Sequence, residues 1–327
     1  MPPRISVVVA TRNRASLLAK ALAGLEAQQF PMEDFEVVVV DNGSTDDTCD
    51  RVSAHMGAVT NVRYMFEPTV GLSVARNTGC RVARGEWVAF LDDDAVPQSN
   101  WLTRIVAAFD EVSPTPACVG GPVEPIFEVT PPEWVKGILL DFLSVVDHAQ
   151  RPFFIQDVLH SRKLVAANMA VQKAALDRAG GFHPWLSRVG DSLRSGEDVL
   201  LQLQLERLGL PLYYDPTIRV RHHVSAGRLT RRWLTERAYW GGVSDSLTSF
   251  LNRPPTLWWA LRTLSWSLRA TLQSPLLMAT LLRSSADPQR VESQCMAWHR
   301  LGSVVGGFKA IALSMTSPEL AQPTAAE

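Results

Sequence analysis

Three consecutive carboxylates follow a run of apolar residues in the segment EWVAFLDDD. Asp92, Asp93 and Asp94 close a stretch whose composition is typical of a buried strand. Two like charges about 5 Å apart, at an effective dielectric constant of about 20, repel by roughly 3 kcal/mol. A divalent cation would remove this repulsion, and Mg²⁺ prefers carboxylates together with substrate phosphates. The cluster therefore favours Mg²⁺ or Mn²⁺ and a phosphate-bearing ligand over a solvated turn.

Other polar side chains also end predicted strands. Thr11 and Asn13 follow the β-branched run ISVVVA, and Asp41 ends the run FEVVVV. Ligands of open α/β sheets bind beyond the carboxyl ends of the strands, so we expect these residues to converge with the aspartates on one edge. An aspartate such as Asp41 can accept the N–H of a uracil-like base. The alternative for Asp41 is a turn residue that caps the next helix.

Two common nucleotide motifs are missing from the sequence. It contains no GxxxxGK[ST] loop, and the first strand is followed by TRNRAS rather than GxGxxG. Phosphate-loop and dinucleotide-binding enzymes are therefore disfavoured. The remaining possibility is a nucleotide that is held by the strand-end residues and by a metal ion bound to carboxylates.

A second acidic pair lies in the segment SGEDVL. Glu197 and Asp198 would occupy the first turn of a predicted helix, with Ser195 as its N-cap. Acids in that position interact favourably with the helix dipole by up to about 1 kcal/mol. Taken alone, the pair is better explained by helix stability than by catalysis.

Apolar strands that alternate with helices must position these residues. We expect strands at 5–10, 35–40, 61–66 and 86–91, and helices at 15–28 and 71–85. Continuous apolar strands are typical of sheets covered on both faces. The pattern predicts an α/β fold with an open, mostly parallel, Rossmann-like sheet flanked by helices.

The rest of the chain changes character twice. Residues 114–152 are rich in proline and are expected to cross the sheet edge as an irregular lid or acceptor-side loop. A strand at 164–172, helices at 173–181 and 196–209 and a strand at 211–224 should follow, and beyond Ala226 the pattern is helical. We therefore expect a catalytic domain at 1–225, a helical C-terminal region at 226–315 and a disordered tail at 316–327.

Four motifs together resemble glycosyltransferase family 2, which has the GT-A fold. They are SVVVATRNR, VVVVDNGSTDDT, GLSVARNTGCRVARGEWVAFLDDD, and GEDVLLQLQLERLG followed by YYDPTIRVRHH. They occur in the family's order and cover about residues 4–225. The resemblance implies an inverting, metal-dependent transfer of a sugar from a nucleotide-sugar donor to a hydroxyl acceptor.

The resemblance also assigns roles to residues on the donor side. It implies that Asp92 faces the ribose and that Asp94 holds the metal that bridges the two phosphates. A histidine after the last core strand, often a further metal ligand, matches His222, although the adjacent His223 is an alternative. The residues implied to contact the nucleotide sugar are Thr11, Asn13, Asp41, Arg76, Asn77, Asp92 and Asp93.

On the acceptor side, Glu197 and Asp198 match the family's Glu-Asp motif, whose aspartate is the catalytic base. Asn168 and the segment GGFHPW match the acceptor region, where Trp185 could stack on a sugar ring or simply pack in a loop. Asp41 mildly favours a UDP-sugar, while guanosine and thymidine nucleotides also occur in the family. The sugar, the acceptor and the linkage stay open.

The segment TLWWALRTLSWSLRATL raises the question of a membrane. No acidic residue lies between Asp245 and Asp287, and four arginines do. Tryptophan beside arginine suits the headgroup zone of a bilayer. The longest charge-free run, 270–282, has thirteen residues and contains a proline, too short to span. We weigh an interfacial helix equally against a helix docked on the catalytic domain or on a second subunit, so peripheral membrane association and a homodimer both stay open.

Composition limits the remaining options. The net charge is -1 and 20% of residues are charged, so nucleic-acid binding by a basic surface is disfavoured. The four cysteines are far apart without CxxC pairs, as in reduced cytoplasmic proteins. We expect a cytoplasmic enzyme at the inner face of the membrane, and the resemblance implies a role in surface polysaccharide or glycolipid synthesis. The alternatives are transfer to a peptide or small natural product, and a non-catalytic nucleotide-sugar-binding subunit.

Overall fold

The alternating strands and helices expected from the sequence are present. The computed structural model describes residues 2–58, 61–160, 162–189, 192–253, 256–274, 279 and 287–316. The chain divides into two units. The first contains Met1–Ile126, Val145–Pro184 and Leu201–His223, and the second contains Phe127–Ser144, Trp185–Leu200 and Val224–Glu327. The expected boundary near residue 225 lies close to the last of these divisions, while two earlier segments join the second unit.

The first unit is built around an eight-stranded sheet. Its strand order is β3-β2-β1-β4-β9-β6-β10-β8. The strands are β1 (Ile5–Thr11), β2 (Phe35–Asp41), β3 (Val62–Phe66), β4 (Trp87–Leu91), β6 (Cys118–Gly120), β8 (Phe153–Ile155), β9 (Asn168–Gln172) and β10 (Leu212–Tyr214). Four of the seven pairings are parallel, and the three that involve β9 or β8 are antiparallel. The predicted fold class, a mostly parallel α/β sheet, is confirmed.

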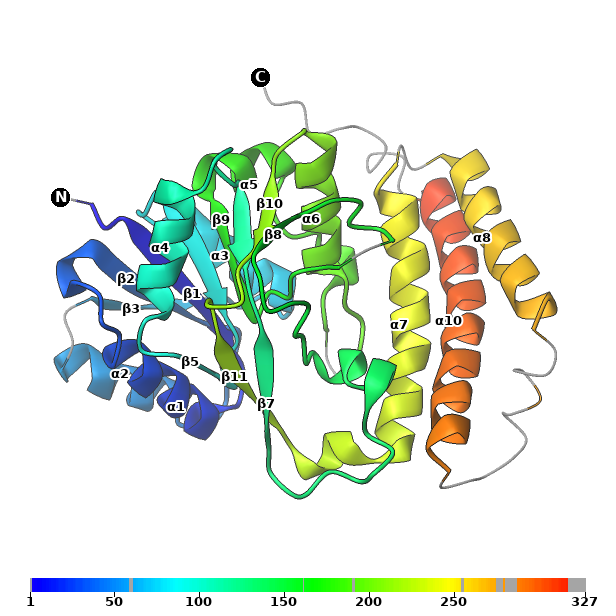
Figure 1. Ribbon diagram of the computed structural model, residues 1–327, viewed down its shortest axis with the longest axis horizontal. Helices are drawn as coiled ribbons and strands as arrows, with labels where there is room; N and C mark the ends of the chain where they lie inside the picture. The colour runs from blue at the N-terminus through cyan, green and yellow to red at the C-terminus, as the bar shows by residue number, and fades with distance from the viewer. Residues whose placement is uncertain are drawn as a thin grey trace. The chain divides into compact units, whose positions relative to one another are not determined.

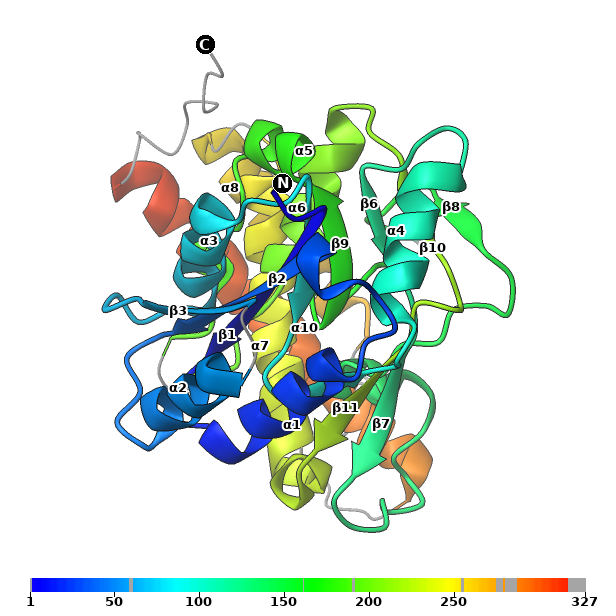
Figure 2. The same ribbon diagram turned by 90° about the vertical axis from the view of Figure 1, so that its left-hand side faces the viewer.

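Helices cover both faces of this sheet. They are α1 (Ala15–Glu26), α2 (Thr48–Ala58), α3 (Leu72–Val82), α4 (Trp101–Glu111), α5 (Lys173–Ala179) and α6 (Glu197–Arg207). Leu18, Leu22 and Ile105 of α1 and α4 share a buried core with Val7 and Val37 of the strands. Helix α3 packs on the opposite face, and Figure 2 shows it and α1 on opposite sides of the strands. The continuous valine runs are explained, since each strand is buried on both faces.

Two parts of the expected pattern need correction. The proline-rich segment is not wholly irregular, since it contains β6 and β7 (Val123–Phe127) and two short 3-10 turns, Gly137–Leu139 and Asp141–Leu143. The single strand expected at 211–224 is two strands, β10 and β11 (Val220–Val224). Strand β11 pairs instead with β5 (Ala95–Pro97) in a separate three-stranded sheet of order β5-β11-β7. Residues Asp215 and Pro216 interrupt the run, because proline cannot donate a ladder hydrogen bond.

The second unit is helical, as expected beyond Ala226. Helices α7 (Arg231–Leu251), α8 (Leu257–Leu272) and α10 (Pro288–Thr316) lie side by side, in yellow, orange and red in Figure 1. Their shared core includes Val243, Phe250, Ala260 and Ala310. Within the described ranges, every helix is too short or too polar to cross a bilayer. The tail expected to be disordered lies, from residue 317 onward, outside the described residues.

Candidate active site

The carboxyl ends of β1 and β2 lie next to each other. Thr11 and Asp41 are directly paired in the parallel register of the two strands, and both are buried. One carboxylate oxygen of Asp41 accepts the Ser44 backbone N–H at 2.8 Å, and the other accepts the Tyr64 hydroxyl at 2.8 Å. Burial and the Asp41 carboxylate raise the pKa of Tyr64, so this hydroxyl remains a donor. The orientation of Asp41 is therefore set from both sides.

Asn13 organises the loop after β1. Its side-chain oxygen accepts the Thr45 N–H at 2.7 Å, and its own backbone N–H donates to the Ser44 hydroxyl at 3.0 Å. The residue has a φ of 53°, a left-handed conformation that asparagine tolerates better than most residues. Asn13 thus ties the loop after β1 to the loop after β2. It does not cap the first helix, whose N-cap position is Arg14.

The three aspartates point to different partners. Asp93 accepts the Thr11 hydroxyl at 2.8 Å and lies 3.0 Å from the Arg14 guanidinium. Burial raises the pKa of Asp93 to about 6, although Arg14 opposes this shift. Asp93 therefore faces into the protein and braces β1 against the end of β4. Its expected contact with the nucleotide sugar stays a prediction, and its two oxygens contact Thr11 and Arg14.

Asp94 meets a histidine from distant sequence. One Asp94 oxygen lies 3.0 Å from Arg14, and the other lies 3.0 Å from Nε2 of His222, which is buried on β11. The Nδ1 atom of His222 is buried and has no hydrogen-bond partner among the described residues. Among the residues that the structure describes, the adjacent His223 contributes its backbone N–H, which donates to the Asp94 carbonyl. Of the two histidines, His222 is the one whose ring contacts Asp94.

Asp92, Asp94 and His222 form a set that could hold a metal ion. Each offers one ligand atom, and these atoms lie within 4.8 Å of one another. Two carboxylates and one imidazole suit Mn²⁺, and the carboxylates suit Mg²⁺. The acidic cluster that follows β4 is thus joined by the expected histidine, and the donor set fits a divalent cation.

A buried arginine lies beside this set. Arg76 on α3 donates to Asp92 at 2.8 Å, and its guanidinium lies 5.4 Å from the ring centroid of Phe182. A fixed positive charge here would suit a ligand that carries phosphates. The neighbouring Asn77 is used differently, since its amide exchanges hydrogen bonds with the backbone of Phe182 at 2.8 and 2.9 Å. Asn77 therefore positions the Gly180–Phe182 turn.

Asn168 requires a correction. It was expected on the acceptor side, but its side chain is completely buried in the first unit. Its oxygen accepts the Trp101 indole N–H at 2.8 Å, and its amide donates to the carbonyls of Pro122 and Ile218. The side chain therefore links α4 and the two sheets within the core. Buried amides need such partners, and this one has no surface left for a ligand.

Within the second unit, α7 holds the segment that leads into Glu197 and Asp198. The Ser195 N–H donates to the Ser244 hydroxyl at 3.0 Å, and Arg237 donates to the Leu193 carbonyl at 3.4 Å. Glu197 is buried and Asp198 half-buried, in the first turn of α6. Burial, then Arg188, lowers the pKa of Arg237 to about 10, while Glu197 and Asp198 oppose that shift. The pair thus lies in a segment held by α7, near a half-buried cation.

Comparison with known proteins finds a similar family. Residues 6–157 match the family model described as Glycosyl transferase family 2. The matched stretch is a little under half of the chain, and over it the chain is similar to this family.

Several known proteins are similar to parts of this chain. Validoxylamine A glucosyltransferase of Streptomyces hygroscopicus subsp. jinggangensis is 32% identical over 64% of this chain and 53% of its own length. Glucosyl-dolichyl phosphate glucuronosyltransferase of Haloferax volcanii is 25% identical over 76% of this chain and 78% of its own. Pre-mycofactocin glycosyltransferase of Mycobacterium tuberculosis is 29% identical over 74% of this chain and 47% of its own length. The chain thus spans about half the length of the first and third relatives.

Solved structures support the fold. A mannosyltransferase from Pyrobaculum calidifontis, in complex with GDP-Man and Mn²⁺, has a TM-score of 0.54 and 20% identity, covering 97% of this chain and 76% of its own. Residues 1–349 of TarS from S. aureus have a TM-score of 0.53 and 19% identity. The match covers 95% of this chain and 90% of the TarS chain. At such identities the likeness is one of fold, and it agrees with the GT-A architecture expected from the motifs.

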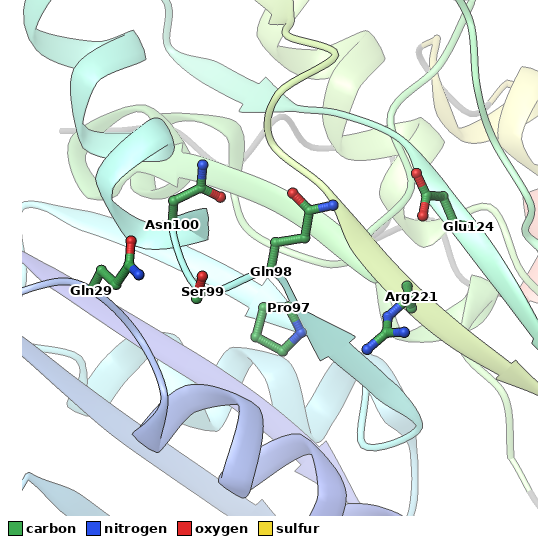
Figure 3. Close-up of a pocket in the computed structure, with 7 residues that line it drawn as sticks. All are labelled: Gln29, Pro97, Gln98, Ser99, Asn100, Glu124 and Arg221. Atoms are coloured by element: carbon green, nitrogen blue, oxygen red, sulfur yellow. The ribbon is translucent and has the colours of Figure 1, made fainter.

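A polar hollow lies on the other side of β11 in the first unit. It has a volume of about 600 Å³, and Figure 3 shows its lining residues: Gln29, Pro97, Gln98, Ser99, Asn100, Glu124 and Arg221. Successive side chains of a strand face opposite ways, so Arg221 turns away from the face on which His222 meets Asp94. The hollow is therefore separate from the metal-binding set.

Two polar partners in the first unit were not identified from the sequence. Arg14 bridges Asp93 and Asp94, and Tyr64 holds Asp41. Arg14 lies inside the motif SVVVATRNR, but the motif does not predict that its side chain contacts Asp93 and Asp94, which lie 79 and 80 positions later in the sequence. Tyr64 could have been found from strand alternation, since β3 pairs with β2 and Tyr64 lies opposite Val39, two positions before Asp41.

Proposed function

We propose that the protein is a metal-dependent glycosyltransferase that moves a sugar from a nucleotide-sugar donor to a hydroxyl acceptor with inversion. The observation that carries this proposal is the Asp92, Asp94 and His222 set in the same unit as the Thr11–Asp41 strand ends. The family and its named relatives, all transferases of sugars, support it.

The donor side of the proposed reaction belongs to the first unit. Asp41 would accept the N–H of the nucleotide base, and Asp94 and His222 would hold Mg²⁺ or Mn²⁺. Arg76 would add positive charge near the diphosphate. When bound, the metal would stabilise the charge that develops on the departing nucleotide diphosphate. Related folds have been solved with GDP-Man and Mn²⁺, with UDP and with UDP-GlcNAc, and we favour a UDP-sugar because of Asp41.

The acceptor side would use the second unit. Asp198 would take the proton from the acceptor hydroxyl as that oxygen attacks the anomeric carbon. A new carbon–oxygen bond forms while the bond to the nucleotide diphosphate breaks, and attack from the opposite face inverts the anomeric centre. Arg237 and the Ser244 hydroxyl would keep Glu197 and Asp198 in place, and Trp185, partly exposed, could stack on a sugar ring.

The relatives' names divide between two kinds of acceptor. Glucosyl-dolichyl phosphate and poly(ribitol-phosphate) name a lipid-linked sugar and a polymer, whereas validoxylamine A is a small molecule. We propose transfer to a glycan or glycolipid at the inner face of the cell membrane. The second candidate is transfer to a small natural product, favoured by the name of a relative that is 32% identical over 64% of this chain.

Donor binding and transfer can be tested separately. A panel of sugar nucleotides should raise the melting temperature in Mn²⁺ and not in chelator, since a ligand at a hundredfold excess over its Kd adds about 2.7 kcal/mol. Asp198→Asn should keep this donor-dependent shift and lose transfer. Equal donor binding in chelator would remove the metal from the proposal, and near-normal turnover of Asp198→Asn would remove the base.

A further inference from the structure

Helix α8 exposes an apolar face that no described residue covers. Leu257, Leu261, Leu268 and Leu272 recur at helical spacing, and all four are exposed, with Leu272 at 77%. The adjoining side of α8 is buried, since Ala260, Thr263 and Leu264 pack toward α7 and α10. The helix is therefore fixed in its unit by one side and offers the other to solvent.

Tryptophan and arginine border this leucine face. Trp258 and Trp266 are 58% and 52% exposed. The Arg262 guanidinium lies 5.3 Å from the Trp258 ring centroid and 4.7 Å from that of Trp266, so one cation is held between two exposed rings. Cation–π contacts of this kind limit the rotamers of all three side chains. The border is thus both aromatic and cationic.

The charge of this region has one sign. No acidic residue occurs from Ser246 to Ala286, whereas Arg262 and Arg269 lie on α8 itself and Arg253 lies over the Trp259 ring. A second copy of the chain packed face to face would bring Arg262 and Arg269 of both copies together, since a twofold contact uses the same patch on each copy. An anionic surface instead complements the arginines. The charges therefore favour a lipid surface over self-association.

We propose that the α8 face, defined by Leu257, Trp258, Leu261, Trp266, Leu268, Arg269 and Leu272, docks on an anionic phospholipid bilayer. The leucines would enter the boundary between headgroups and acyl chains, the tryptophans would lie at headgroup level, and the arginines would pair with lipid phosphates. The inference deepens the proposed location of the transferase, and rests on that proposal for placing the bilayer at the inner membrane face.

Sedimentation of the full chain with vesicles tests this docking. The protein should sediment with vesicles of mixed phosphatidylcholine and phosphatidylglycerol and much less with phosphatidylcholine alone. Raising the salt from 0.1 M to 1 M should weaken binding, because the screening length falls from about 10 Å to about 3 Å. Equal binding to both kinds of vesicle, or none to either, would overturn the proposal. The assay contains no sugar nucleotide, so its failure would leave the proposed transfer reaction untouched.

Matched variants distinguish binding through the α8 face from nonspecific binding to vesicles. Trp258→Ala with Trp266→Ala should lower the partition coefficient roughly tenfold or more, whereas Phe308→Ala, an exposed aromatic on α10, should not change it. Arg269→Gln should lower it about fivefold, and exposed Arg104→Gln on α4 should not. Circular dichroism should show unchanged folding in all four.

Self-association gives the opposing outcome. Sedimentation velocity should show the same mass for the wild type and for the Trp258→Ala, Trp266→Ala variant. A wild-type dimer that this variant converts to a monomer would assign the face to a second copy of the chain and overturn membrane docking.

Discussion

At the residue scale, neighbouring aspartates of identical chemistry lie in different environments. Asp93 turns inward to Thr11, while Asp92 and Asp94 turn toward Arg76 and His222. This division means that one acid of the cluster supports the fold and two remain for a cation. Arg14 contacts both groups, because its guanidinium lies 3.0 Å from Asp93 and from Asp94.

Arg14 therefore supplies positive charge to the cluster before any metal binds. Arg14→Gln should lower the free energy of unfolding by about 1 to 2 kcal/mol, because it removes the ion pairs with Asp93 and Asp94. The effect is modest because the Arg14 side chain is partly exposed and water screens these pairs. Mn²⁺ should then raise the melting temperature of the variant more than that of the wild type. Thermal unfolding with and without Mn²⁺ measures this, with the exposed Arg12→Gln as control. Equal Mn²⁺ effects in both proteins would show that Arg14 does not balance the acids.

Sequence alone could place the acids at the end of a strand but could not orient them. Thr11, Asp41 and the aspartates could be brought to one edge because parallel strands end together. Which of three adjacent carboxylates faces inward depends on the backbone turn after β4, and Asn168 is buried because α4 places Trp101 beside it. Such choices follow from tertiary contacts that local patterns do not contain.

At the element scale, valine-rich strands were predictable and their partners were not. Strands β1, β2 and β4 were evident from continuous apolar runs. The antiparallel position of β9 between β4 and β6 was not evident, because the apolar pattern of a strand does not tell which way it runs relative to its neighbours. The close crossing of α7 and α10 was also missed, although Gly302 and Gly306 recur four apart. A Cβ added at Gly306 would lie 2.6 Å from the Val243 carbonyl oxygen, so glycine lets these backbones touch.

The packing of α3 on the sheet gives a test at this scale. A Cβ added at Gly79 would lie 3.1 Å from Val8 Cγ2 and 3.2 Å from Val40 Cγ2, and it also clashes with Val8 Cγ1. Gly79→Ala should destabilise by about 1 to 3 kcal/mol despite the better helix propensity of alanine. Gly241→Ala on α7, where the nearest atom would be at 3.5 Å, should be neutral or stabilise by up to about 1 kcal/mol. Urea unfolding compares them, and equal effects would contradict the close approach of α3.

At the scale of the whole molecule, the proposed chemistry is divided between the two units. The strand-end residues and the metal-binding set belong to the first unit, and Glu197, Asp198 and Trp185 belong to the second. We therefore expect donor affinity to respond to changes in the first unit and transfer to depend on both.

The stability of the first unit also depends on one buried carboxylate. Glu36 on β2 accepts hydrogen bonds from Ser6, Arg63 and Arg84 at 2.7 to 2.9 Å. Burial alone would raise the pKa of Glu36, but these donors lower it below 4.5. The charged form therefore stabilises the fold above pH 4.5, and this contribution is lost as the pH falls through the lowered pKa.

Glu36→Gln should consequently lower the free energy of unfolding by roughly 2 to 4 kcal/mol at pH 7. The difference in the free energy of unfolding between the variant and the wild type should become smaller as the pH falls below 4.5. Denaturant unfolding across pH measures the gap, with exposed Glu33→Gln as a control that should show little effect. A gap that stays constant with pH would exclude the charge of Glu36 as its source.

The pairing of β4 with β9, and of β11 with β5, has a consequence for biosynthesis. Asp94 emerges from the ribosome long before His222, which lies 128 positions later, and β9 reaches β4 only after the intervening chain has been made. A nascent chain that has formed β1 to β4 therefore exposes an unpaired strand edge ending in carboxylates with only arginine to neutralise them. The same acids that suit a cation in the finished protein would then discourage premature edge-to-edge association during translation.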